Sequence, residues 1–189
     1  DLATGALRQR YPLPAADSFC NDIAIGGDGT VYATDSTHMN VLQLVPGAAA
    51  LEHWAGNGAF GSADAILDGI AILRGRVFVN AYRTGKLYAI DVARDGSAGR
   101  VVEIVIDRPL ESPDGMRPYG SGSLLVAESG SGGRLSRVDV RGDRAQATTL
   151  AGGFADGPAA VTVVGRTAYV LEAQFARLAE PPGAATPPK

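Results

Sequence analysis

Oxygen-bearing side chains recur at similar intervals along this chain of 189 residues. Asn21, Asp68, Asp114 and Asp156 are 47, 46 and 42 residues apart (68 − 21, 114 − 68 and 156 − 114), and a short apolar run follows each. Hard oxygen ligands gathered at one site suit Ca²⁺ or Mg²⁺, with Mn²⁺ and Zn²⁺ as further alternatives. A simpler role is also open, because an Asp before Gly at a strand start can hydrogen-bond the backbone of a turn.

Asp114 lies within "ESPDGM", residues 111–116. Taken alone, the Pro-Asp-Gly run predicts a turn. If the recurring residues occupy one position in a repeat arranged about an axis, Asp114 also points towards that axis, and the two interpretations are compatible. A second polar set ends a later strand of each unit: Asp35, Asn80, Glu128 and Glu172. These oxygen donors could face the same central cavity.

The spacing reflects a repeat whose units begin near residues 21, 68, 114 and 156. The second unit, "DGIAILRGRVFVNAYRTGKLYAID", contains an apolar strand, a Gly turn, a strand with an aromatic residue, a polar end and a third strand. A fourth strand, such as residues 101–105, completes the unit. Four antiparallel strands with a period near ~40–50 residues predict an all-β β-propeller.

We expect one partial propeller domain over residues 1–178, holding about four blades of an expected six. Residues 3–13 are expected to be the outer strand of an earlier blade, and residues 179–189, rich in Pro and Ala, to be a loop or tail. A propeller removes its open edges only by closing the ring. We therefore expect either a missing segment or a partner chain to complete it.

The composition restricts which partners and which cellular locations we expect. The chain is 46% hydrophobic and 20% charged with a net charge of −3, so no basic field attracts nucleic acid. It has no apolar run long enough for a membrane helix, and no membrane partner is expected. Cys20 is alone, so no internal disulfide can form. The chain starts at Asp1, which fits a removed leader or a piece of a longer protein and slightly favours an exported bacterial protein.

Two tempting motifs lack the context that their chemistry needs. Residues 56–61, "GNGAFG", match the dinucleotide pattern, but only residues 62–67 separate them from the next strand, so no helix fits. His38 and His53 belong to different strands without a nucleophile at a telling spacing. Neither nucleotide binding nor a Ser-His-Asp triad is expected.

Several motifs in order resemble the senescence-marker-protein/gluconolactonase family, the relatives of regucalcin. They are "CNDIAIGGDGTVYATDS" (20–36), "LDGIAI" (67–72), "SPDGM" (112–116) with "LLVAES" (124–129), and "DGPAAVTVVGRTAYVLEAQ" (156–174). The resemblance covers nearly the whole chain. It is more specific for the fold than for the substrate, because related propellers without this chemistry share the blade pattern.

The resemblance implies a six-bladed propeller with one divalent ion, most simply Ca²⁺, in its central channel. The family's ligands are a Glu from the first blade, two Asn and an Asp in a Pro-Asp-Gly context. Asp114 matches that Asp, which also serves as the general base, and Asn21 matches one Asn. Asp68 stands where the second Asn is expected, and it can still bind a hard cation. The early Glu has no counterpart in this sequence.

The function implied is metal-assisted hydrolysis of a sugar lactone or similar cyclic ester bound in the central channel. Two other functions stay open. The chain could be a non-catalytic propeller that binds a ligand or protein on its face, since one fold hosts many functions. It could also be a propeller enzyme with other chemistry, such as a lyase or phosphotriesterase.

Overall fold

A computed structural model describes residues 1–56 and 58–174. Within these residues the chain forms fourteen β-strands, one 3-10 turn, η1 (Ala63–Ala65), and no α-helix. No helix in this part of the chain is long and apolar enough to cross a membrane. The all-β class predicted from the repeat is confirmed.

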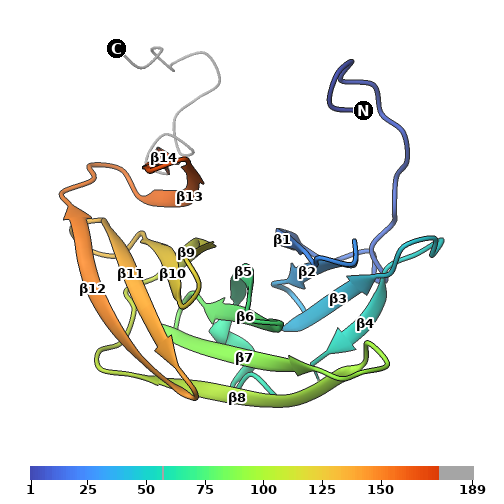
Figure 1. Ribbon diagram of the computed structural model, residues 1–189, viewed down its shortest axis with the longest axis horizontal. Coiled ribbons are helices and arrows are strands. Elements are labelled where there is room, and N and C mark those ends of the chain that lie inside the picture. Colours follow the sequence, from blue (N-terminus) through green and yellow to red (C-terminus); the bar gives the residue numbers. More distant parts are fainter. Residues whose placement is uncertain (57, 175–189) are drawn as a thin grey trace.

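The strands form three complete blades and the beginning of a fourth (Figure 1). The first blade contains β1 (Cys20–Ile25), β2 (Val31–Asp35), β3 (Asn40–Leu44) and β4 (Glu52–Ala55). The second contains β5 (Leu67–Leu73), β6 (Arg76–Ala81), β7 (Lys86–Val92) and β8 (Ala98–Ile106). The third contains β9 (Pro113–Tyr119), β10 (Ser123–Glu128), β11 (Arg134–Arg141) and β12 (Arg144–Gly152). β13 (Pro158–Val164) and β14 (Thr167–Glu172) are the two fourth-blade strands among the described residues.

Local sequence explains these hairpins. β5 and β6 are joined by Arg74 and Gly75, whose φ angles of 52° and 74° are both positive. Two consecutive positive φ angles define the tight turn whose twist matches a β-hairpin. In β6, Val77 and Val79 pack towards the first blade, whereas Phe78 between them packs towards the third. The period of two along a strand thus lets one blade bury both of its faces.

The core consists of three apolar layers between successive blades. The layer between the first and second blades includes Tyr32, Val41, Ile70 and Val79. The layer between the second and third includes Phe78, Met116, Leu124 and Val126. The third layer is smaller and contains Leu125, Leu135 and Val161. Because each blade needs a neighbour to cover its faces, the blades stabilise one another in sequence along the arc.

The described residues form an open arc rather than a closed ring (Figure 1). About four blades were predicted, and the structure describes three with four strands and one with two. Residues 3–13, predicted to be an outer strand, contain no strand, and the segment that includes them runs away from the blades. That prediction is wrong, because residues 3–13 pair with no strand of the described chain. The predicted domain end at 178 and the tail at 179–189 lie outside the described residues.

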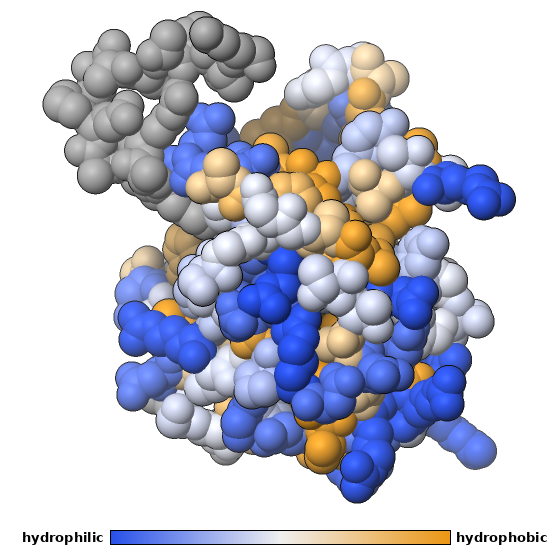
Figure 2. All heavy atoms as spheres, turned by 90° about the vertical axis from the view of Figure 1, so that its left-hand side faces the viewer, coloured by the Kyte–Doolittle hydropathy of each residue, from blue (hydrophilic) through white to orange (hydrophobic). Residues whose placement is uncertain are grey.

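The outer surface is more hydrophilic than the region near the opening of the arc. Figure 2 views the molecule from the left of Figure 1 and shows a largely hydrophilic lower part, with hydrophobic side chains gathered higher up, towards the opening.

A short parallel pairing between β8 and β12 joins the second and third blades. It pairs Arg144 with Val105 and Ala145 with Ile106. The inner strands β1, β5, β9 and β13 lie along the inside of the arc, where the predicted site residues belong.

Candidate functional site

The same irregularity interrupts the inner strand of each complete blade. The pairing of β1 with β2 shifts between Cys20 and Ile23, and that of β5 with β6 shifts between Leu67 and Ile70. In β9 the shift falls opposite Val126 and Glu128. These are β-bulges, which leave one extra residue unpaired and re-aim nearby side chains. Bulges of this kind are common next to functional sites.

Asn21, Asp68 and Asp114 each occupy the first position of their bulge. The structure therefore brings these three predicted residues to equivalent places on β1, β5 and β9. Close packing of the bulges also explains why Gly follows Asp68 and Asp114. A Cβ on Gly69 would collide with the backbone oxygen of Asp114.

The fourth predicted residue is displaced from this series. Val161 pairs with Val170 in the fourth hairpin, as Ile70 pairs with Val79 in the second. Counting back two residues, the position of Asp68 is taken by Ala159 and not by Asp156. The prediction for Asp156 is wrong because its Asp-Gly pair lies in the loop before β13, and the sequence does not distinguish such a loop from a bulge.

Asp68 and Asp114 form a close carboxyl pair. Burial of Asp68, which is 6% exposed, together with the nearby Asp114 carboxyl, raises the pKa of Asp68 to about 8. Burial also raises the pKa of Asp114 to about 6, although a hydrogen bond from the Gly115 backbone opposes the shift. Oδ1 of Asp68 is buried and has no hydrogen-bond partner among the residues that the structure describes. A buried oxygen of this kind is costly unless a proton or cation satisfies it.

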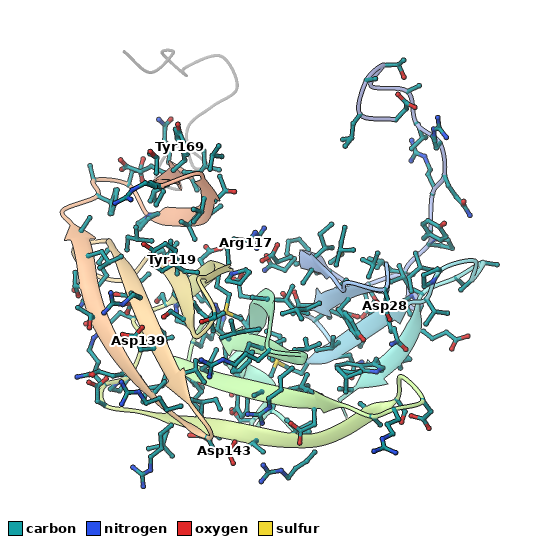
Figure 3. The ribbon with its side chains drawn as sticks, viewed as in Figure 1. Asp28, Arg117, Tyr119, Asp139, Asp143 and Tyr169 are labelled. Carbon is teal, nitrogen blue, oxygen red and sulfur yellow. The ribbon has the colours of Figure 1, made fainter. Side chains whose placement is uncertain are left out.

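A third carboxylate, from Asp22, joins the pair and was not proposed from the sequence. Its oxygens accept hydrogen bonds from Arg117 at 2.7 and 3.0 Å and from the backbone of Ile70 at 3.2 Å. The bidentate ion pair ties β1 to β9 across β5, and Figure 3 shows Arg117 on the inner side of the arc. Asp22 also contributes to the raised pKa values of Asp68 and Asp114. The sequence offers only a weak signal, an Asn-Asp pair, because the two partners are 95 residues apart.

The three bulge residues carry the types of oxygen atom that a hard divalent cation binds. Asp68 and Asp114 supply carboxylate oxygens, and the amide nitrogen of Asn21 donates to Ser36 at 3.2 Å, which leaves the amide oxygen for another partner. Carboxylate and amide oxygens are the ligands that Ca²⁺ and Mg²⁺ prefer. The described residues contain no group of three or more His, Cys, Asp or Glu arranged to hold a metal. Two carboxylates and one amide would thus be only part of a ligand set.

Hydrogen bonds between blades fix the positions of the bulges. On β2, the Thr34 hydroxyl accepts a hydrogen bond from the Asp22 backbone at 3.1 Å and donates to the Asp68 backbone carbonyl at 2.6 Å. Asn80 does the same one blade later. Its side chain accepts a hydrogen bond from the Gly69 backbone in the bulge of β5 at 3.0 Å and donates one to the Asp114 backbone carbonyl at 2.6 Å. Thr34 and Asn80 are therefore equivalent positioning residues that hold each inner strand against the next.

The second predicted polar set has a structural role in the described part of the chain. Asp35 is fully buried and accepts hydrogen bonds from the Phe19 backbone at 3.1 Å and the His38 ring at 2.9 Å. Glu128 is also buried and pairs with Arg108. Glu172 accepts a hydrogen bond from the Asp156 backbone. Asn80 bridges two blades, as described above. Every member of this set therefore bonds to backbone or side-chain groups of the blades. This corrects the expectation that the four residues face a central cavity.

Thr34→Val tests this positioning role. Valine keeps the shape but leaves two buried backbone groups without their partner, so we expect the free energy of unfolding to fall by about 1–2 kcal/mol. Urea denaturation measures the change. The control is Thr148→Val, the same substitution at an exposed position of β12, which should stay within about 0.5 kcal/mol. Equal effects of the two substitutions would contradict a special role for Thr34.

No known family profile and no curated protein sequence matches this chain significantly. Its fold is nevertheless similar to solved structures. A catalytically inactive virginiamycin B lyase from Staphylococcus aureus, with quinupristin, gives a TM-score of 0.69 at 15% identity over 89% of this chain and 54% of the lyase. A gluconolactonase from Xanthomonas campestris gives 0.58 at 18% identity, over 82% of this chain and 54% of that one. A nidogen/laminin complex gives 0.61 at 16% identity, over 75% and 51%.

These similarities define the class of fold. The chain spans about half the length of the structures that it matches, as an arc of three blades and part of a fourth should. The similar structures include enzymes with different chemistry and a complex of two proteins, so the shared fold does not select a function. The residues at the inner bulges are therefore the better guide to function.

Proposed function

We propose that this chain carries part of the active site of a divalent-metal-dependent hydrolase, most simply a lactonase that opens a sugar lactone or similar cyclic ester. The observation that supports it is the placement of Asn21, Asp68 and Asp114 at equivalent bulges of three neighbouring strands. The unpartnered buried oxygen of Asp68 adds to this. The resemblance of residues 112–116 to the gluconolactonase motif points in the same direction.

In this proposal Asn21, Asp68 and Asp114 hold the cation through oxygen atoms. When bound, a divalent cation supplies Lewis-acid polarisation of the ester carbonyl and stabilises developing negative charge. Asp114 acts as general base and accepts a proton from the attacking water. In the metal-free chain burial raises the pKa of Asp114 to about 6, and a bound cation would favour the charged form, which is the form that accepts a proton. Gly115 donates a backbone hydrogen bond to Asp114 at 2.9 Å and orients the carboxyl.

Lyase chemistry has less support from the residues present. The lyase structure with quinupristin is an inactive histidine-to-alanine variant, whereas neither histidine of this chain lies among the bulge residues. The ring of His38 is bonded to Asp35 at 2.9 Å and lies 3.4 Å from Asp17. His53 is on β4, the outer strand of the first blade. The inner face therefore offers carboxylates for acid–base chemistry and no imidazole.

Asp114→Asn tests the proposal. Asparagine keeps an acceptor for the Gly115 backbone but removes a charge and the base. We expect Ca²⁺ affinity, measured by calorimetry, to fall at least about tenfold, and lactone hydrolysis to fall by about 10²-fold or more. The control is Asp139→Asn on β11, whose carboxylate is bonded to Ser123 at the other end of a blade and should affect neither measurement.

Two outcomes would contradict the proposal. If Asp114→Asn keeps both cation affinity and hydrolysis, Asp114 is neither ligand nor base. If the unaltered chain binds no divalent cation at any accessible concentration, the metal-dependent hydrolase is excluded for this chain. The non-catalytic binding module would then be the better description.

A further inference from the structure

Arg117 is the only basic side chain on the four inner strands of the described chain, β1, β5, β9 and β13. It lies on β9, which contacts β5 on one side and β13 on the other, and it follows Asp114 by three residues. Three residues of strand span about 10 Å. Figure 3 shows Arg117 on the inner side of the arc, where inner strands surround the axis of a propeller. The proposed cation ligands and one cationic side chain therefore share an inner surface.

The Arg117 guanidinium already holds a carboxylate. Its Nη1 and Nη2 donate to the two carboxylate oxygens of Asp22 at 2.7 and 3.0 Å. This pair of parallel bonds is the geometry by which arginine recognises carboxylate and phosphate groups. Nη1 also donates to the Met116 backbone carbonyl at 2.7 Å, which helps to orient the guanidinium on β9. The structure thus shows Arg117 with an oxyanion group in place, supplied by the chain itself.

Asp22 does not depend on Arg117 alone. Its Oδ1 accepts a hydrogen bond from the Ile23 backbone at 2.8 Å, and its Oδ2 accepts one from the Ile70 backbone at 3.2 Å. Both bonds remain if Arg117 turns away. The Arg117 side chain is 37% exposed and that of Asp22 is 14% exposed, so water screens the pair. Exchange of Asp22 for an oxyanion from outside would therefore leave neither charged group buried without a partner.

We propose that Arg117 binds an oxyanion group, a carboxylate or a phosphate, of a ligand in the central channel, and that Asp22 occupies the guanidinium when this ligand is absent. Combined with the hydrolase proposed above, on which this step rests, the substrate is a lactone with an anionic group. Its ester carbonyl lies at the Asp68 and Asp114 carboxyl pair, and its far end lies at Arg117. The Asp22 carboxylate then stays beside the carboxyl pair, where a bound cation compensates its charge.

Calorimetric titration with three related sugars tests the proposal on the whole 189-residue chain, after a chelating resin has removed divalent cations. D-Glucuronate, D-glucose 6-phosphate and D-glucose carry a carboxylate, a phosphate and a neutral hydroxyl at the same carbon. We expect at least one of the anionic sugars to bind about tenfold or more tightly than glucose. The order of the two anionic sugars separates a carboxylate site from a phosphate site. Because no divalent cation is present, the result does not depend on the proposed hydrolase.

Substitutions of Arg117 locate the binding. Arg117→Gln should abolish the preference for anionic sugars, and Arg117→Lys should reduce it, because lysine keeps the charge but lacks the two parallel donors. The matched control is Arg137→Gln on β11. Arg137 is paired with Asp139 at 3.0 Å and is 39% exposed, but it lies outside the inner strands, so the preference should be unchanged. Circular dichroism checks that each variant remains folded.

Asp22→Asn separates ligand binding from a purely structural ion pair. Asparagine removes the competing carboxylate, so we expect affinity for the anionic sugars to rise about tenfold, whereas disruption of the site would lower it. The gain should vanish when Arg117→Gln is added, because it requires the freed guanidinium. No preference for an anionic sugar, a weaker binding by Asp22→Asn, or a gain that persists in the double variant would each overturn the proposal. Failure of the hydrolase is seen separately, as a chain that binds no divalent cation.

Discussion

Replacing Asp68 with Asn is expected to stabilise the metal-free protein by about 2–3 kcal/mol at pH 7. Burial and the neighbouring Asp114 carboxyl make the charged form of Asp68 unfavourable in the folded protein. Asparagine has almost the same shape, carries no charge, and offers an amide donor to the Asp114 carboxyl. The bond from Thr34 is retained, because it goes to the backbone of residue 68.

The stabilisation should depend on pH in a defined direction. The pKa of Asp68 is raised from 3.8 to about 8 on folding, so the folded protein binds more protons than the unfolded chain between these values. The free energy of unfolding of the unaltered protein therefore falls as pH rises from about 4 to about 8. Asparagine removes this dependence. The difference between the two proteins should be small near pH 4 and should grow towards pH 8.

Urea denaturation in the presence of a chelator, at several pH values, measures this difference. Asp64→Asn is the matched control, because Asp64 is exposed and should change stability by less than about 0.5 kcal/mol at any pH. A loss of stability in Asp68→Asn at pH 7, or a difference that does not change with pH, would contradict the carboxyl pair. If Asp68 binds a cation as proposed, added Ca²⁺ should reduce the advantage of the variant, because the cation would bind the charged form.

The repeat made much of this arrangement predictable. Alternating apolar residues and glycine turns predicted the hairpins, and the constant spacing placed Asn21, Asp68 and Asp114 at one position of successive blades. The structure adds the reason for that position, a bulge that turns each side chain away from the ladder. A spacing argument works here because neighbouring blades repeat the same backbone geometry.

Other features depend on contacts that spacing does not contain. Asp156 follows the Asp-Gly pattern of the repeat, yet it lies three residues before the bulge position, which Ala159 occupies. The pair between Asp22 and Arg117 joins two blades that are not consecutive. Glu128 ends a strand just as a cavity residue would, and only the fold shows that it pairs with Arg108. Side-chain direction at a strand end is set by its partners, which the local sequence does not specify.

Glu128→Gln is expected to lower the free energy of unfolding by about 2–4 kcal/mol. The Glu128 carboxylate is buried and accepts two hydrogen bonds from Arg108, at 2.8 and 2.9 Å, and others from Ser136 and the Glu111 backbone. Glutamine keeps the size of the side chain but leaves the Arg108 charge without its counterion. The loss is smaller than for a fully enclosed pair, because Arg108 remains partly exposed.

Acid should reduce the difference between the two proteins. Burial alone would raise the pKa of Glu128, but hydrogen bonds from Arg108 and Ser136 outweigh it and hold that pKa below its ordinary value. The stabilisation is therefore present above the unfolded pKa of about 4.3 and is lost as pH falls through the lower folded value. Urea denaturation from pH 7 down to pH 3 measures it, with Glu103→Gln as the control, because the pair of Glu103 with Lys86 is exposed. Equal losses for both substitutions would show that Glu128 does not stabilise the third blade through a buried pair.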